Sequence, residues 1–172
     1  MTETRRHLYP EIEPYETGML DVGEGHSLYW ERVGTPGAKP AVFLHGGPGG
    51  GIAPDHRRQW DPEAYDVLLF DQRGCGRHND TWRIVEDIER LREMCGHEKW
   101  QAFGGSWGST LALAYAQKYS DRVSELVLRG VFLARQQEKS WLYGYGASEI
   151  MAEQWDQFTG LIPEAERGDL VR

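Results

Sequence analysis

The chain has 172 residues, of which 40% are hydrophobic and 27% are charged, and its formal net charge is -8. This length suits one domain that buries a sizeable core. The negative charge disfavours nucleic acid or an anionic membrane as the main partner, because both would repel it. No apolar run approaches the roughly 20 residues that cross a bilayer, and no secretory signal follows the first methionine.

The two cysteines carry no sign of a metal or disulfide framework. Cys75 and Cys95 lie far apart in the sequence, without a Cys-x-x-Cys pair or a Cys/His cluster. We interpret them as free thiols in a reducing compartment, which predicts a cytoplasmic protein.

The first expected elements form a hairpin, and the following ones form a sheet. Residues 18–34 hold two segments around a Gly-Glu-Gly turn, which predicts an antiparallel hairpin at the edge of a sheet. Four short, continuous apolar runs then predict strands that are buried on both faces, as in a parallel sheet. These runs cover residues 41–44, 67–70, 100–103 and 125–133.

Helical patterns separate the later strands. Residues 81–96 place apolar side chains on one face and charges on the other, with Asp80 or Thr81 as the expected N-cap and Gly96 as the expected end. Residues 111–119 are apolar nearly all round, which predicts a buried helix.

The order of these elements predicts the fold class. Strands alternating with helices indicate an α/β protein with a doubly wound, mostly parallel sheet. After Val131 the chain is helix-prone and contains no further strand pattern. We therefore divide it into an α/β core at residues 1–133 and the beginning of a helical insertion at 134–172.

Three glycine-rich corners follow predicted strands, and "GGSWGS" carries the most informative pattern. It fits G-x-S-x-G with Gly104, Ser106 and Gly108, between a strand and an apolar helix. Such a tight turn lifts a serine hydroxyl out of the sheet and directs the N–H of the next residue, Trp107, to the same space. A serine in an ordinary strand-to-helix loop, or at a helix cap, is the alternative interpretation.

The second corner, "HGGPGGG" at residues 45–51, frees backbone N–H groups to bind a ligand. In a serine hydrolase this loop supplies an oxyanion donor, for which Gly47 N–H is the candidate and Gly46 N–H the next. The loop also suits a phosphate, but it lacks the lysine and spacing of the nucleotide motifs. His45 is interpreted as a residue that orients the loop.

The third corner, "DQRGCGR" at residues 71–77, follows another buried strand. Asp71 stands where functional groups of open α/β sheets gather. We expect instead that Asp71 and Arg73 fix the loop through a local ion pair. Nothing basic is placed to activate Cys75, so it is interpreted as a small loop residue.

These corners occur in an order that resembles a known family. With "HGGPGG", "DQRGCGR", "DIERLR", "FGGSWGSTLALAYAQ" and "ELVLRG", the chain resembles the proline iminopeptidases (prolyl aminopeptidases) of the α/β-hydrolase superfamily. The resemblance implies the N-terminal half of the α/β-hydrolase sheet, followed by the start of a helical cap. It also implies release of N-terminal proline from peptides through an acyl-enzyme. Ser106 would attack the carbonyl, the N–H groups of Trp107 and Gly47 would hold the oxyanion, and Gly46 and Gly47 would contact substrate. No metal or organic cofactor is implied.

The resemblance also implies a catalytic base for Ser106, which this sequence lacks at the expected place. In this superfamily the triad runs serine, acid, histidine along the chain, yet all six histidines here precede Ser106. We therefore expect an N-terminal fragment that is inactive, or nearly so, by itself. One alternative is a non-catalytic remnant that pairs with another chain or associates with itself through an exposed sheet edge. Another is an esterase of the same fold that uses His45 or His78 as a substitute base.

Overall fold

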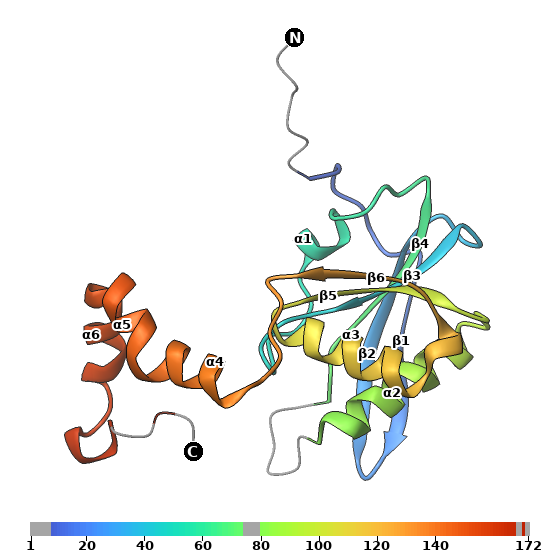
Figure 1. Cartoon of the computed structure of the whole chain (residues 1–172). Coiled ribbons are helices and arrows are strands. Elements are labelled where there is room, and N and C mark those ends of the chain that lie inside the picture. Colours follow the sequence, from blue (N-terminus) through green and yellow to red (C-terminus); the bar gives the residue numbers. More distant parts are fainter. Residues whose placement is uncertain (1–7, 74–79, 168–169, 171–172) are drawn as a thin grey trace. The chain divides into compact units, whose positions relative to one another are not determined.

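A computed structural model describes residues 8–73, 80–167 and 170 of the chain. The chain divides into two compact units, residues 1–131 and 132–172 (Figure 1).

The first unit is built on a six-stranded sheet in the order β1-β2-β4-β3-β5-β6. The strands are β1 (Glu16–Gly23), β2 (His26–Gly34), β3 (Lys39–Leu44), β4 (Tyr65–Phe70), β5 (Trp100–Gly105) and β6 (Val123–Arg129). The β1–β2 and β2–β4 pairs are antiparallel, and the other neighbouring pairs are parallel. The predicted hairpin at the sheet edge and the mostly parallel sheet are therefore confirmed.

Positive backbone φ angles explain where two of the strands end. The residues of the β1–β2 turn, Gly23, Glu24 and Gly25, all have positive φ angles of 83°, 55° and 76°. The last predicted strand ends at Arg129 instead of residue 133, because Gly130 turns the backbone into the left-handed region with φ 54°. The apolar residues after Gly130 had suggested a longer strand.

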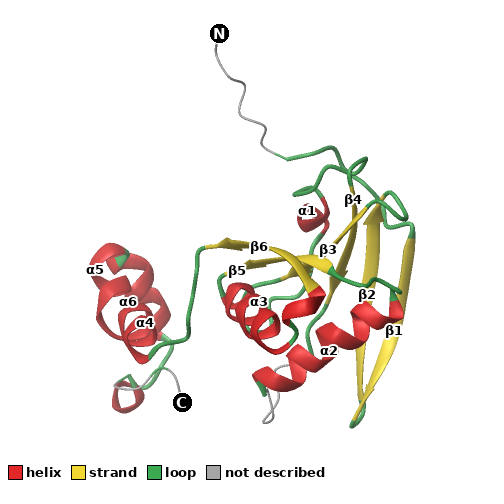
Figure 2. Ribbon diagram, turned by 45° about the vertical axis from the view of Figure 1, so that its right-hand side comes forward, coloured by secondary structure: helices red, strands yellow, loops and turns green. Residues whose placement is uncertain are grey.

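Helices cover both faces of this sheet (Figure 2). They are α1 (Pro54–Arg57), α2 (Thr81–Met94) and α3 (Trp107–Lys118), and a short 3₁₀ turn, η1 (Ser120–Arg122), precedes β6. The Asp80 carboxylate accepts a hydrogen bond from Trp82 N–H at 2.9 Å, and Gly96 follows α2 with φ 70°. The expected cap and end of α2 are confirmed, whereas the four-residue α1 was not predicted.

The core consists of one apolar cluster on each face of the sheet. The larger cluster joins α2 and α3 to the sheet through side chains such as Ile88, Leu111 and Phe70. The smaller cluster lies on the other face around Phe43 and Trp60. The segment predicted as a buried helix, residues 111–119, belongs to α3. Its buried residues lie mainly on the side of α3 that faces the sheet.

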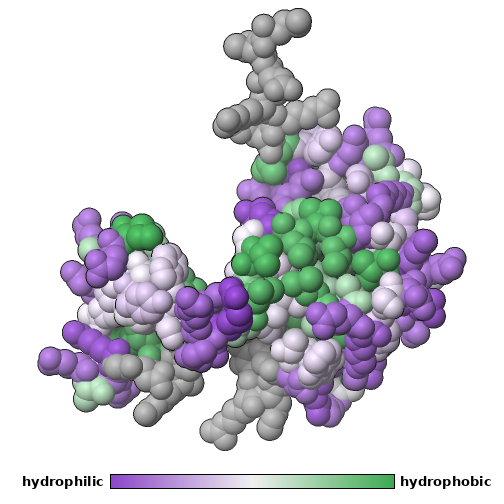
Figure 3. Space-filling model, viewed as in Figure 1, coloured by the Kyte–Doolittle hydropathy of each residue, from purple (hydrophilic) through white to green (hydrophobic). Residues whose placement is uncertain are grey.

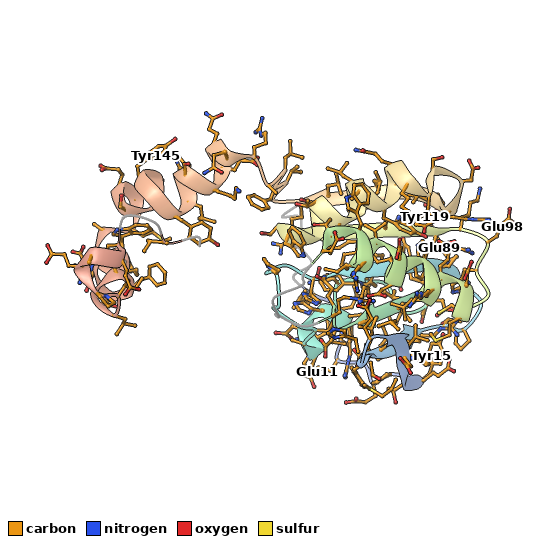
Figure 4. All side chains as sticks on the ribbon, turned by 90° about the horizontal axis from the view of Figure 1, so that it is seen from below. Glu11, Tyr15, Glu89, Glu98, Tyr119 and Tyr145 are labelled. Atoms are coloured by element: carbon orange, nitrogen blue, oxygen red, sulfur yellow. The ribbon has the colours of Figure 1, made fainter. Side chains whose placement is uncertain are left out.

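A buried polar cluster fastens α2 to α3. The Tyr115 hydroxyl donates to Glu89 at 2.7 Å, and the Arg92 guanidinium donates to the same carboxylate at 2.6 Å. Glu89 is labelled in Figure 4. Burial raises the pKa of this carboxyl, but the bonds from Arg92 and Tyr115 outweigh burial and lower its pKa overall. Glu89 therefore stays ionised between the two helices.

The second unit is helical in the residues that the structure describes. It contains α4 (Gln136–Ser140), a π-helical turn η2 (Trp141–Tyr145), α5 (Gly146–Ile150), α6 (Ala152–Gly160) and a 3₁₀ turn η3 (Glu164–Glu166). The expectation of helices without a strand is met over these residues. An apolar hollow of about 320 Å³ lies among the side chains of Leu142, Tyr143, Ala147, Met151, Trp155 and Phe158.

Within the described ranges, none of the helices has the length and apolar character needed to span a membrane.

Candidate active site

Ser106 is the single residue that links the end of β5 to the start of α3. Its backbone has φ 55° and ψ -121°, a conformation that is strained for a residue with a side chain. Its N–H donates to the carbonyl of Arg129 at 2.9 Å, which fixes the bend to β6. The side chain is exposed and makes no capping hydrogen bond to α3. A simple helix-cap role therefore does not explain this serine.

The glycines on either side of Ser106 are required by close backbone contacts. A Cβ on Gly104 would lie 2.1 Å from the carbonyl oxygen of Gly108, and a Cβ on Gly108 would lie 2.0 Å from that of Leu44. No side chain fits at these separations. The spacing of the G-x-S-x-G pattern therefore allows α3 to start directly against the ends of β5 and β3.

The loop at residues 45–51 borders this bend. A Cβ on Gly46 would lie 3.6 Å from Cβ of Ser106. The loop is closed by a hydrogen bond from Gly50 N–H to the Gly46 carbonyl at 3.3 Å, and Gly47 has φ 128°. Among the described residues, no backbone carbonyl accepts from Gly47 N–H. Trp107 is the first residue of α3, so its N–H has no acceptor within the helix.

His45 is a buried structural residue with both ring nitrogens engaged. Its Nδ1 lies 2.8 Å from the carbonyl of Gly46, and its Nε2 accepts from Gln72 N–H at 3.1 Å. These partners fix the neutral tautomer that carries its proton on Nδ1. Burial lowers the pKa of His45. The only lone pair of the neutral ring is occupied, so this histidine orients the loop and is not placed to accept a proton.

Gln72 connects all three corners and was missed by the sequence reasoning. Its side-chain amide donates to the His45 carbonyl at 3.0 Å, and its Oε1 accepts from the indole N–H of Trp107 at 3.1 Å. The only available signal was an amide side chain two residues after the end of a predicted strand. Through Gln72, the loop at 45–51 and the start of α3 are held in one arrangement around Ser106.

Asp71 and Arg73 fix their loop, but with other partners than expected. Asp71 accepts from the backbone N–H of Ile52 at 2.8 Å, which ties down the end of the glycine loop. Arg73 forms a two-pronged ion pair with Asp87 of α2, with both hydrogen bonds at 2.6 Å. The prediction of a local Asp71–Arg73 pair is replaced by these longer-range contacts, because the buried carboxylate of Asp87 faces the guanidinium.

Breaking the Arg73–Asp87 pair should destabilise the fold strongly. Both side chains are buried, so Asp87→Ala removes both hydrogen bonds that the Arg73 guanidinium donates to this carboxylate and should lower the free energy of unfolding by about 3–5 kcal/mol. Glu86 on the same helix provides the control, because its ion pair with Lys118 is exposed and Glu86→Ala should cost about 1 kcal/mol or less. Urea unfolding measures both. Equal effects of the two substitutions would contradict this assignment.

Two of the predicted loop residues, Cys75 and His78, lie outside the described residues. Cys95 is a free thiol, as expected, and burial raises its pKa to about 11.

No described histidine is placed to act as a base for Ser106. The His56 ring packs against Phe43 at a tilt, with the ring centroids 4.7 Å apart. Its Nδ1 accepts from Ala53 N–H at 2.9 Å, so its neutral form carries the proton on Nε2. His97 contacts the ring of Trp100 at the opposite end of β5. His26 begins β2 next to the hairpin turn.

Comparisons with known proteins agree with this architecture. Residues 39–163 match the family of the alpha/beta hydrolase fold. The chain is 54% identical to a proline iminopeptidase of Arabidopsis thaliana, over 95% of this chain and 45% of that protein. It is 51% identical to a proline iminopeptidase of Xylella fastidiosa, over 96% of this chain and 56% of that protein.

A solved structure is also similar. It is a proline iminopeptidase-related protein from Thermus thermophilus, with a TM-score of 0.54 and 29% identity over 66% of this chain and 43% of that one. The chain spans about half the length of the curated relatives it matches. With the matching residues reaching from β3 into the helical unit, the chain belongs to the α/β-hydrolase fold family.

Proposed function

We propose that this chain carries the nucleophile of a serine-type aminopeptidase that releases N-terminal proline from peptides. The observation that carries the proposal is the exposed Ser106, held at a strained bend between β5 and α3 with its side chain left out of helix capping. The substrate class is taken from the relatives that are named proline iminopeptidases.

The proposed reaction is acyl transfer. Ser106 Oγ attacks the carbonyl of the proline residue, the amine of the next residue leaves, and water then releases proline from the ester. The N–H groups of Trp107 and Gly47 are the proposed oxyanion donors, with Gly46 beside the substrate. The start of α3 adds a field that favours the developing negative charge.

The proton acceptor for Ser106 is the part that the described residues do not provide. His45 and His56 both use their lone pair on a backbone N–H. A hydrolase that lacks a triad member keeps only a residual acceleration of roughly 10³–10⁴ over water. We therefore expect the 172-residue chain by itself to release proline from a proline arylamide slowly or not at all.

Complementation tests both parts of the proposal. We expect that adding the remaining C-terminal part of a proline iminopeptidase relative, which is proposed to supply the acid and the histidine, restores release from proline arylamide. Alanine arylamide and a short-chain ester serve as substrate controls. Equal turnover of all three substrates would contradict the proline specificity, and full activity of the 172-residue chain alone would contradict the missing base. In that case a His78→Ala variant would test whether this histidine is the substitute.

A further inference from the structure

Gln72 lies where the ends of three strands meet. The strands β3, β4 and β5 are parallel, with β3 between the other two, so their carboxyl ends lie at one edge of the sheet. Gln72 follows the end of β4, where the preceding residue, Asp71, donates its backbone N–H to the carbonyl of Tyr29 on β2 at 2.9 Å. Gln72 is buried, with 8% of its surface exposed. Its amide can therefore reach both the loop after β3 and the helix after β5.

Three polar atoms of Gln72 bond to these two elements. Its backbone N–H donates to Nε2 of His45 at 3.1 Å, and its side-chain amide donates to the His45 carbonyl at 3.0 Å. Its Oε1 accepts from the indole N–H of Trp107 at 3.1 Å. A Cβ on Gly108 would lie 3.1 Å from the same His45 carbonyl, so this carbonyl lies against the first turn of α3. Gln72 thus joins the glycine loop and α3 at their point of contact.

The His45 ring transmits this contact to the peptide that carries the Gly47 N–H. Its Nδ1–H donates to the Gly46 carbonyl at 2.8 Å, and the same carbonyl accepts from Gly50 N–H at 3.3 Å. In a trans peptide, such as that between Gly46 and Gly47, the C=O and N–H groups point in opposite directions. The Gly47 N–H is therefore directed away from His45 and Gly50. By fixing His45, Gln72 fixes the direction of one proposed oxyanion donor.

The indole contact acts on the other proposed donor. Trp107 begins α3, so its backbone N–H has no acceptor within the helix. Its side chain is partly buried against the larger core cluster, and its indole N–H is held by Gln72. Because the allowed side-chain rotamers depend on the backbone angles, a side chain that is held at its ring also restricts the backbone of its own residue. The direction of the Trp107 N–H is restricted in this way.

We propose that Gln72 is a positioning residue for acyl transfer, which orients the Gly47 N–H through His45 and the Trp107 N–H through its indole. The catalytic part of this inference rests on the proposed function, whereas the orientation of the two N–H groups does not. Donors that are held in place before the reaction need no reorganisation when negative charge develops. Gln72 therefore acts on the transition state and not on the binding of the peptide.

Nuclear magnetic resonance of the chain, labelled with ¹⁵N at glycine and tryptophan, tests the orientation. Gln72→Met keeps the length of the side chain but has no N–H donor and only a weakly accepting sulfur. The Trp107 indole N–H should then exchange with water roughly tenfold faster, and the backbone signals of Gly47 and Trp107 should shift. Gln101→Met is the control, because Gln101 is also buried but lies near the start of β5. Unchanged signals in Gln72→Met, or equal changes in both variants, would overturn the proposal.

Steady-state kinetics of the complemented enzyme test the catalytic part. Figure 3 shows apolar residues gathered over β6 on the surface of the first unit, so the measurements use concentrations at which light scattering finds parent and variants equally dispersed. Gln72→Met should lower kcat for proline arylamide roughly tenfold to a hundredfold, which is less than the complete loss of an oxyanion donor. KM should stay within about twofold. Gln101→Met should leave both constants unchanged. A higher KM with an unchanged kcat would contradict the positioning role.

Trp107→Phe provides a second variant that removes the indole contact alone. It should lower kcat by less than Gln72→Met, and the double variant should be little slower than Gln72→Met, because the shared hydrogen bond is already lost. Fully additive losses would refute the coupling. If circular dichroism shows that Gln72→Met does not fold, Trp107→Phe decides the question, since it must still lower kcat without raising KM. A complemented parent enzyme that releases no proline would refute the proposed function, and the resonance comparison would then decide the orientation by itself.

Discussion

In the enzyme complemented with the C-terminal part, Ser106→Ala is expected to abolish covalent labelling by a fluorophosphonate probe. The probe reacts with a serine hydroxyl that a base activates beside N–H donors, and Ser106 is exposed next to the loop at 45–51. In the complemented enzyme, the same substitution should lower kcat for proline arylamide by at least about 10⁴-fold, because no other group can form the acyl-enzyme. Mass spectrometry of the intact protein and steady-state kinetics measure the two effects.

Ser120→Ala is the matched control for this result. Ser120 is also exposed, but it lies in η1, after the end of α3 and remote in sequence from the glycine corners. Its replacement should leave both labelling and turnover unchanged. If the Ser106→Ala variant were still labelled, and the modified peptide mapped to another part of the chain, the nucleophile would be a residue other than Ser106.

Gly104→Ala and Gly108→Ala are expected to destabilise the first unit strongly. Each added Cβ would meet a backbone carbonyl oxygen, at 2.1 Å from Gly108 and 2.0 Å from Leu44 respectively. Neither oxygen can move without shifting β3, β5 or the start of α3. Each substitution should lower the free energy of unfolding by about 3 kcal/mol or more, and the melting temperature by roughly 6–12 °C.

The adjacent Gly105 provides the control within the same motif. A Cβ there would lie 3.6 Å from the guanidinium of Arg129, which is ordinary contact. Gly105→Ala should therefore change the melting temperature by only a few degrees, as measured by thermal unfolding of all three variants. If Gly105→Ala were as damaging as Gly104→Ala, the close strand–helix approach would not be the reason for the glycine spacing.

Much of the fold follows from patterns that are local in the sequence. Continuous apolar runs predicted β3, β4 and β5, since a strand buried on both faces needs no polar alternation. The cap at Asp80 and the end at Gly96 act within a few residues of α2. The glycine corners could also be located from the sequence, because a tight bend needs glycines among the residues that form it.

Other features were decided only by residues that meet in space. Arg73 pairs with Asp87, 14 positions away, and Gln72 reaches His45 and Trp107, 27 and 35 positions away. No local pattern indicates which of several polar partners a buried side chain will face. The sequence by itself determined the strand order along the chain, the bend at Ser106 and the glycines that permit it. The tertiary structure alone decided that His45 has no free lone pair and that Arg73 pairs with Asp87, because burial and pairing depend on neighbours that the fold supplies.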